Sequence, residues 1–161
     1  MKNGEKHGYG IIYHDFENDW IYRYEGEFKY KVSDGYGIMY FKDGSIYNGE
    51  FKNNPENEGF GSPEGFGLSD DKDHYYKGQF KNGYKWGYGI NYFKEERCIY
   101  KGEFVKGVHE GYGIFYYPDG DIYEGEFKND NYHGFGFLYK PNVEKFINIW
   151  EDDELIFEQK L

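Results

Sequence analysis

The chain has 161 residues, enough for one ordinary domain, and aromatic side chains make up 24% of it. With 24 glycines and no alanine it is a poor candidate for a helical fold, whereas tyrosine and phenylalanine suit a pleated sheet. The net charge of −11 disfavours generic binding to nucleic acid, and the single cysteine, Cys98, excludes an internal disulfide scaffold.

A five-residue motif recurs along the chain. Its copies open at Tyr24 (YEGEF), Tyr47 (YNGEF), Tyr76 (YKGQF), Tyr100 (YKGEF) and Tyr123 (YEGEF), in steps of 23, 29, 24 and 23 residues. A divergent copy, FINIW, begins at Phe146. A second marker, GYG or GFG, runs in phase and begins at residues 8, 35, 65, 87, 111 and 134. Two markers in phase indicate a tandem repeat over residues 1–150.

The repeat is irregular in three places. The chain begins in mid-repeat, so the first copy is partial, and its first half is either missing or lies in a longer parent protein. The 29-residue step carries GFG twice, which predicts a loop insertion near 54–73 with Gly65 keeping the phase. Residues 151–161 leave the pattern and are acidic, then amphipathic, so we interpret them as a C-terminal acidic cap or tail with a possible short helix.

Each copy is expected to form a β-hairpin. In residues 123–145, YEGEF is a short strand, KNDN has turn chemistry and GFGFLYK is the return strand. Strand alternation then places Tyr123, Gly125 and Phe127 on one face and the two glutamates on the other. The Asp-Gly pairs in KDG (42–44) and PDG (118–120) predict the turns that join one hairpin to the next.

The alternation of rings and glycines predicts how the core forms. A strand glycine beside an aromatic residue leaves a slot in which the ring can lie flat. We expect the two glycines of each GxG to share a face, and rings of neighbouring repeats to stack into a one-dimensional aromatic ladder.

These motifs resemble MORN repeats (membrane occupation and recognition nexus). The family pattern of about 23 residues is similar to YEGEFKNDNYHGFG at 123–136 and to YNGEFKNN at 47–54, and the likeness extends over nearly the whole chain. Gln79, Val105, the insertion and FINIW depart from it. The resemblance implies an all-β fold, an elongated, single-layer, twisted antiparallel sheet of tandem hairpins. It also implies a non-catalytic scaffold or protein-interaction module without cofactors, of the kind found in cytoskeletal and ciliary (axonemal, radial-spoke-like) complexes.

Aromatic residues are the first candidates for protein binding. Most rings must build the core, but a single-layer sheet has two faces, and surplus rings would line an apolar groove for a partner helix or peptide. The candidate groove residues are Tyr24, Phe28, Tyr47, Phe51, Tyr76, Phe80, Tyr100, Phe104, Tyr123 and Phe127.

The alternative is a membrane adaptor. Residues 77–106 hold seven basic residues against three acidic ones, whereas both flanks are acidic. The candidates for anionic phospholipid, or for an acidic partner segment, are Lys77, Lys81, Lys85, Lys94, Arg97 and Lys101. This hypothesis requires the side chains to share one face of the sheet.

Catalytic and metal sites are not expected. His7, His14, His74, His109 and His133 fall near turns, and equivalent positions of adjacent repeats lie about 10 Å apart, too far to share a metal ion. The repeated glutamates, such as Glu103 and Glu126, are copied rather than unique, which favours a structural role. An enzyme whose catalytic domain lies elsewhere in a parent protein stays open.

Location and partners follow from the same reasoning. No apolar run is long enough to cross a bilayer, and Met1 begins no signal-peptide pattern, so we expect a soluble cytoplasmic protein associated with the cytoskeleton or a cilium. We expect protein partners in a larger assembly, a possible homodimer through the ends of the array, no nucleic acid, and membrane binding only as the disfavoured alternative.

Overall fold

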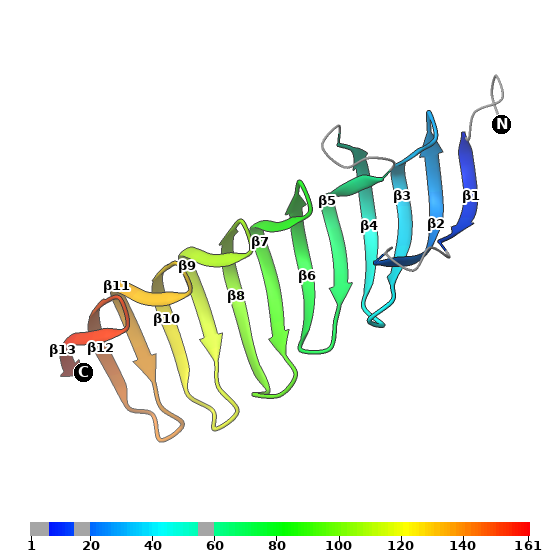
Figure 1. Cartoon of the computed structure of the whole chain (residues 1–161). Coiled ribbons are helices and arrows are strands. Elements are labelled where there is room, and N and C mark those ends of the chain that lie inside the picture. Colours follow the sequence, from blue (N-terminus) through cyan, green and yellow to red (C-terminus); the bar gives the residue numbers. More distant parts are fainter. Residues whose placement is uncertain (1–6, 15–19, 55–59) are drawn as a thin grey trace. The chain divides into compact units, whose positions relative to one another are not determined.

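The computed structural model describes residues 7–14, 20–54 and 60–161. The chain divides into two compact units, Met1–Tyr84 and Lys85–Leu161. In the described residues every regular element is a β-strand, and within each unit the strands form one antiparallel layer in chain order (Figure 1). The expected all-β fold of tandem antiparallel hairpins is therefore confirmed.

The first unit contains six strands. They are β1 (Gly8–Tyr13), β2 (Ile21–Lys29), β3 (Val32–Phe41), β4 (Ile46–Asn53), β5 (Gly61–Asp70) and β6 (His74–Lys81). Between β4 and β5 the chain takes a longer path than in the other hairpins, and Gly65 still pairs with Phe80 as Gly35 pairs with Phe51. The start of the partial first repeat and five residues of the expected insertion lie outside the described residues.

The second unit contains seven strands. They are β7 (Tyr84–Phe93), β8 (Cys98–Val105), β9 (Val108–Tyr116), β10 (Ile122–Lys128), β11 (Asn131–Tyr139), β12 (Lys145–Glu151) and β13 (Glu154–Lys160). The expected short C-terminal helix is wrong, because residues 154–160 form β13 and pair antiparallel with β12. Asp152 and Asp153 have φ values of 46° and 68°, which folds the chain back as a hairpin instead of starting a helix.

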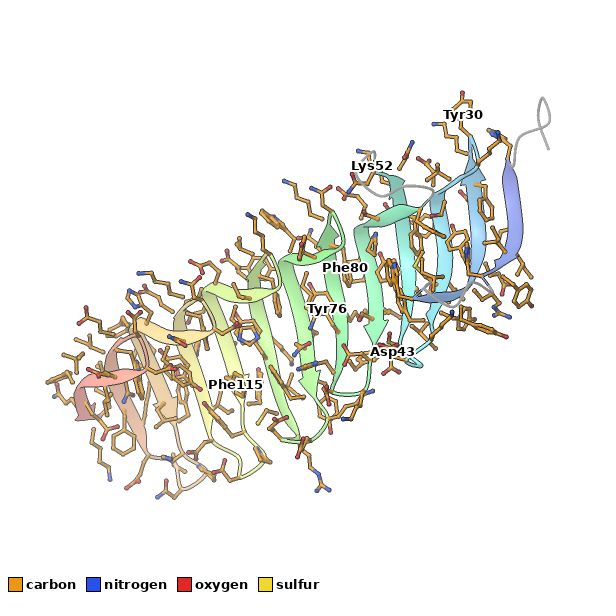
Figure 2. The ribbon with its side chains drawn as sticks, viewed as in Figure 1. Tyr30, Asp43, Lys52, Tyr76, Phe80 and Phe115 are labelled. Carbon is orange, nitrogen blue, oxygen red and sulfur yellow. The ribbon has the colours of Figure 1, made fainter. Side chains whose placement is uncertain are left out.

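Two-residue turns close the hairpins at one end of the strands, which we call the tip end. Both central residues have positive φ at Tyr30–Lys31, Asn82–Gly83, Lys106–Gly107, Asn129–Asp130 and Asp152–Asp153. This is the type I′ conformation, whose twist matches that of the flanking strands. Tyr30 and Lys52 lie at the tip end, and Asp43 lies at the opposite end, where longer turns join successive hairpins (Figure 2).

Hydrogen bonds tie four of these tip turns to the preceding hairpin. Asp130 N donates to His109 O at 3.1 Å, and Asp153 N donates to Tyr132 O at the same distance, 23 residues further on. The carboxylates of these two aspartates accept in return from His109 N at 2.7 Å and Tyr132 N at 2.6 Å. Because the same exchange recurs with the repeat, it fixes the spacing between adjacent hairpins.

A β-bulge separates the two glycines of GxG in four hairpins, β2–β3, β4–β5, β8–β9 and β10–β11. In the β10–β11 pair, Gly125 faces Gly136, but Glu126 faces His133, so the register shifts between them. Gly134 has a φ of +61° and lies against the Glu126 carboxylate, whereas Gly136 lies against the Tyr123 ring. The expectation that the two glycines share a face is therefore wrong, because the bulge turns them toward opposite faces of the sheet.

Val143 occupies a position that glycine holds in other repeats. Its N–H donates to Lys140 O, as Gly44 donates to Phe41 O and Gly120 to Tyr117 O, and its φ is 71°. A β-branched residue is strained there. We expect Val143→Gly to raise the free energy of unfolding by about 0.5–1 kcal/mol, measured from urea denaturation. Gly120→Val should produce the opposite change, and a loss of stability in Val143→Gly would contradict this account.

Candidate functional site

An aromatic ladder forms the core of each unit. In the first unit, Tyr24 contacts Phe28 and Phe51, Tyr47 contacts Phe51 and Phe80, and Tyr76 contacts Phe80, all edge to face with ring centroids 4.9–5.1 Å apart. Tyr76 and Phe80 extend from the same face of β6 (Figure 2). In the second unit the same pattern runs through Phe104, Tyr100, Phe127 and Tyr123 and ends on Trp150. We call the side of the sheet that carries these rings the ladder face.

Glycines make room for the tyrosines of the ladder. A Cβ built on Gly102 or Gly113 would lie 2.4–2.6 Å from ring or hydroxyl atoms of Tyr100. The Tyr100 hydroxyl donates to Glu103 O at 3.1 Å, and Tyr24, Tyr47 and Tyr76 make the equivalent bond. The expectation that rings lie on glycines is confirmed for the second glycine of four GxG motifs and for their strand partners: Gly37 with Gly26, Gly67 with Gly49, Gly113 with Gly102 and Gly136 with Gly125.

The ten candidate groove residues are all part of this core. Tyr24, Phe28, Tyr47, Phe51, Tyr76, Phe80, Tyr100, Phe104, Tyr123 and Phe127 are between 0 and 8% exposed. A ring that is already covered by glycine backbone and neighbouring rings offers no surface to a partner. These residues therefore belong to the core, and the exposed aromatic surface is formed by other residues.

The ladder tyrosines make the fold sensitive to alkali. Burial, with help from nearby carboxylates for most of them, raises the pKa of Tyr24, Tyr47, Tyr76, Tyr100 and Tyr123 above the ordinary value. In the unfolded chain these groups ionise near pH 10, so their stabilising contribution is complete below pH 10 and is lost as the pH rises further. We expect the urea midpoint to fall between pH 9 and pH 11.5, and a constant midpoint would contradict the burial of these hydroxyls.

His109, which the sequence analysis placed near a turn, is a buried member of the ladder face. It is 8% exposed, its ring centroid lies 3.8 Å from that of Tyr100, and its Nδ1 lies 3.1 Å from Asp130 Oδ1. Tyr132 takes the equivalent place beside Tyr123, at 4.4 Å. The signal was available in the sequence, because residue 109 precedes Tyr132 by one repeat length.

The opposite side of the sheet, which we call the open face, carries a second set of rings. The middle residue of each GxG points there, and the six are exposed: Tyr9, Tyr36, Phe66, Tyr88, Tyr112 and Phe135. Each stands between the two glycines of its motif, and the glutamates of the repeats share their face. Sequence reasoning anticipated rings on a second face but did not identify these residues.

Tyrosine hydroxyls on the open face bind the repeated glutamates. Tyr36 Oη donates to Glu50 Oε1 at 2.5 Å, and Tyr88 Oη donates to Glu103 Oε1 at 3.2 Å. Glu124 accepts from Tyr112 at 2.7 Å and from Tyr139 at 3.2 Å. Partial burial and the bond to Glu124 raise the pKa of Tyr112 to about 12. The open face is therefore an ordered surface of rings and carboxylates.

The six basic candidates do not share one face. Lys77 and Lys81 lie on the open face of β6, and Lys101 lies on that of β8, with its Nζ 4.7 Å from the Tyr116 ring centroid. Lys85 Nζ donates to Oδ1 of the buried Asn91 at 2.8 Å, on the ladder face. Lys94 and Arg97 belong to the connection between β7 and β8. The structure thus distributes these side chains over both faces and a turn.

The described residues contain neither a cluster of metal ligands nor a helix that could span a membrane. In residues 7–14, 20–54 and 60–161, no three His, Cys, Asp or Glu side chains lie close enough together to hold a metal ion. No helix among these residues is long and apolar enough to cross a membrane. The described residues instead form a sheet whose ladder face buries its rings and whose open face leaves rings exposed.

Comparison with known families agrees with this geometry. The MORN repeat family matches residues 1–14, 24–46, 76–92, 100–122 and 123–142, together more than half of the chain. The chain belongs to the MORN-repeat family. MORN repeats are generally protein- or membrane-interaction modules without catalytic activity. No curated protein matches the chain. In this MORN protein, the open face carries the exposed ring of each GxG.

Proposed function

We propose that this MORN protein is a non-catalytic scaffold that binds protein partners through the open face of its repeats. The observation that carries the proposal is the contrast between the two faces: the ladder face buries its rings, whereas the open face leaves a ring of each GxG exposed beside ordered carboxylates. Exposed apolar residues rimmed by polar groups are typical of protein-interaction sites.

The proposed setting is a cytoskeletal or ciliary complex, axonemal and radial-spoke-like, in the cytoplasm. Support for this setting comes from the resemblance to MORN repeats of such assemblies. Protein partners are the main expectation, with homodimerisation through the ends of the array as a further one. A membrane adaptor is less well supported, because the six basic candidates are distributed over both faces and a turn.

Purification of the tagged protein from its own cells, with and without detergent, tests the proposal. The expected result is a stoichiometric set of cytoskeletal or axonemal proteins that survives detergent, together with a tag signal on those structures by microscopy. The proposal would be overturned if every protein partner disappeared in detergent while anionic lipid copurified. The matched sample is a variant with serine in place of Tyr88, Tyr112 and Phe135, which should lose the partners and keep the fold.

A further inference from the structure

We propose that the open face of β9–β13 is a docking surface for a basic amphipathic helix of a partner protein. This inference rests on the proposed function and deepens it, since it assigns the surface and the chemistry of the partner segment. The surface is formed by an exposed apolar row and by carboxylates that lack a basic counterpart.

The apolar row consists of Tyr112, Phe135, Ile149 and Phe157. Phe135 pairs directly with Ile149, and Ile149 pairs directly with Phe157, so these three side chains stand next to one another on strands β11, β12 and β13. Tyr112 lies on the same face of β9, opposite Glu126. All four are between 41 and 45% exposed, although each would be covered in a core.

Carboxylates surround the row. Glu110, Glu124, Glu126, Glu151 and Glu154 lie on the open face of these strands, against two lysines, Lys128 and Lys145. The Lys145 ammonium lies 4.2 Å from the Phe137 ring centroid and 5.0 Å from that of Tyr139, which shows that rings on this face accept a cation.

Glu151 and Glu154 give the strongest indication of charge complementarity. They are directly opposite in the β12–β13 pair and flank the Asp152–Asp153 turn. Neither has a salt bridge to any residue in the described part of the chain. Like charges placed directly opposite each other destabilise a sheet, so a cationic partner would relieve a repulsion that the chain carries alone.

The dimensions of the surface fit a helix. Four strand spacings of about 4.8 Å separate β9 from β13, giving about 19 Å, which a helix of about 13 residues spans. The apolar stripe of such a helix repeats every three or four residues, about 5 Å, close to the spacing between strands. Its Lys and Arg side chains would flank the stripe and reach the carboxylates.

The equivalent surface of the first unit has a different charge. Phe66 is the middle residue of its GxG and is exposed, but its strand partner is Gln79 instead of a glutamate. Lys77 and Lys81 lie on the same face of β6. A basic helix would meet lysines there, so this surface provides a matched control within the same chain.

Peptide binding to the full 161-residue chain tests the inference, by fluorescence anisotropy in 50 mM salt. The probe is a labelled 14-residue peptide of leucine and arginine with leucines at helical spacing. Its controls are a shuffled peptide of the same composition and a peptide with glutamate in place of arginine. We expect binding of the basic amphipathic peptide, at least tenfold weaker binding of both controls, and a severalfold loss at 300 mM salt.

Variants then locate the site. Phe135→Ser with Ile149→Ser should weaken binding at least tenfold, and Glu151→Gln with Glu154→Gln about threefold or more. Phe66→Ser should leave binding unchanged. The glutamate variants remove a repulsion, so their urea midpoint should not fall, which separates lost binding from lost folding. Equal binding of all peptides, or an unchanged affinity in the Phe135/Ile149 variant, would overturn the inference.

The two proposals can fail separately. If a partner isolated from cells binds the Phe135/Ile149 and Glu151/Glu154 variants as tightly as it binds the parent chain, the docking surface assigned here is wrong and the scaffold function stands. If no protein partner binds the parent chain, the scaffold function itself is wrong.

Discussion

Gly37→Ala is expected to destabilise the protein by about 3 kcal/mol, one of the largest effects of any small substitution in the chain. A Cβ at Gly37 would lie 2.5–2.7 Å from Oη, Cζ and Cε2 of Tyr24. The ring cannot move aside, because its hydroxyl donates to Glu27 O at 2.9 Å and its edges contact Phe28 and Phe51. The urea midpoint, followed by intrinsic fluorescence, measures the loss.

Gly10→Ala is the matched control. Gly10 is also the second glycine of a GxG, but a Cβ there would lie 3.6 Å from the Phe28 ring, an ordinary contact. Alanine should therefore be neutral or slightly stabilising, since it restricts the unfolded chain more than glycine does. Equal losses in Gly10→Ala and Gly37→Ala would show that the ring-on-glycine contact is not the cause.

Tyr100→Ala is expected to cost about 4 kcal/mol. Tyr100 is fully buried, covers Gly102 and Gly113, and contacts Phe104, Phe127 and His109. Its removal leaves a cavity that interrupts the ladder of the second unit. The predicted loss of stability is measured by urea denaturation, and hydrogen exchange should show that amides of β8–β10 lose the most protection.

Two conservative variants separate the ring from its hydroxyl. Tyr100→Phe removes the bond to Glu103 O and should cost about 1 kcal/mol. Tyr123→Phe removes a buried hydroxyl that has no hydrogen-bond partner in the described part of the chain, so it should be neutral or stabilising. If the two variants behaved alike, the hydrogen bond would not be the reason for the difference.

Much of the fold was predictable because the same sequence motif recurs several times along the chain. Tyr123, Gly125 and Phe127 alternate with glutamates, and one hairpin of this kind predicts the others. The bulge was not predictable from alternation, because a pattern of period two assumes a straight strand, and GxG hides a change of face between Gly134 and Gly136. A helix was expected near the C-terminus because residues 151–161 are amphipathic and leave the repeat motif. The repeat spacing predicts a turn there instead, since Asp152–Asp153 follows the Asn129–Asp130 turn by one repeat length.

The candidate site was less predictable than the fold. The motif tyrosines and phenylalanines were the most regular aromatics in the sequence and were therefore the groove candidates, but the structure buries them in the core. The exposed rings, such as Phe135, stand between two glycines and look equally regular. Only the register of the sheet, with Gly136 opposite Gly125, shows that Phe135 points the other way.

The exchange of hydrogen bonds between a tip turn and the hairpin before it has an evolutionary consequence. His109 with Asp130 and Tyr132 with Asp153 make the same two hydrogen bonds. An added hairpin with the same residues would therefore pack against its neighbour through these same bonds. Duplication of a 23-codon segment would copy both the tip-turn aspartate and the residue to which the next tip turn bonds. Descendants of such a gene could change the number of hairpins, and with it the number of exposed rings, while each existing hairpin kept its neighbours.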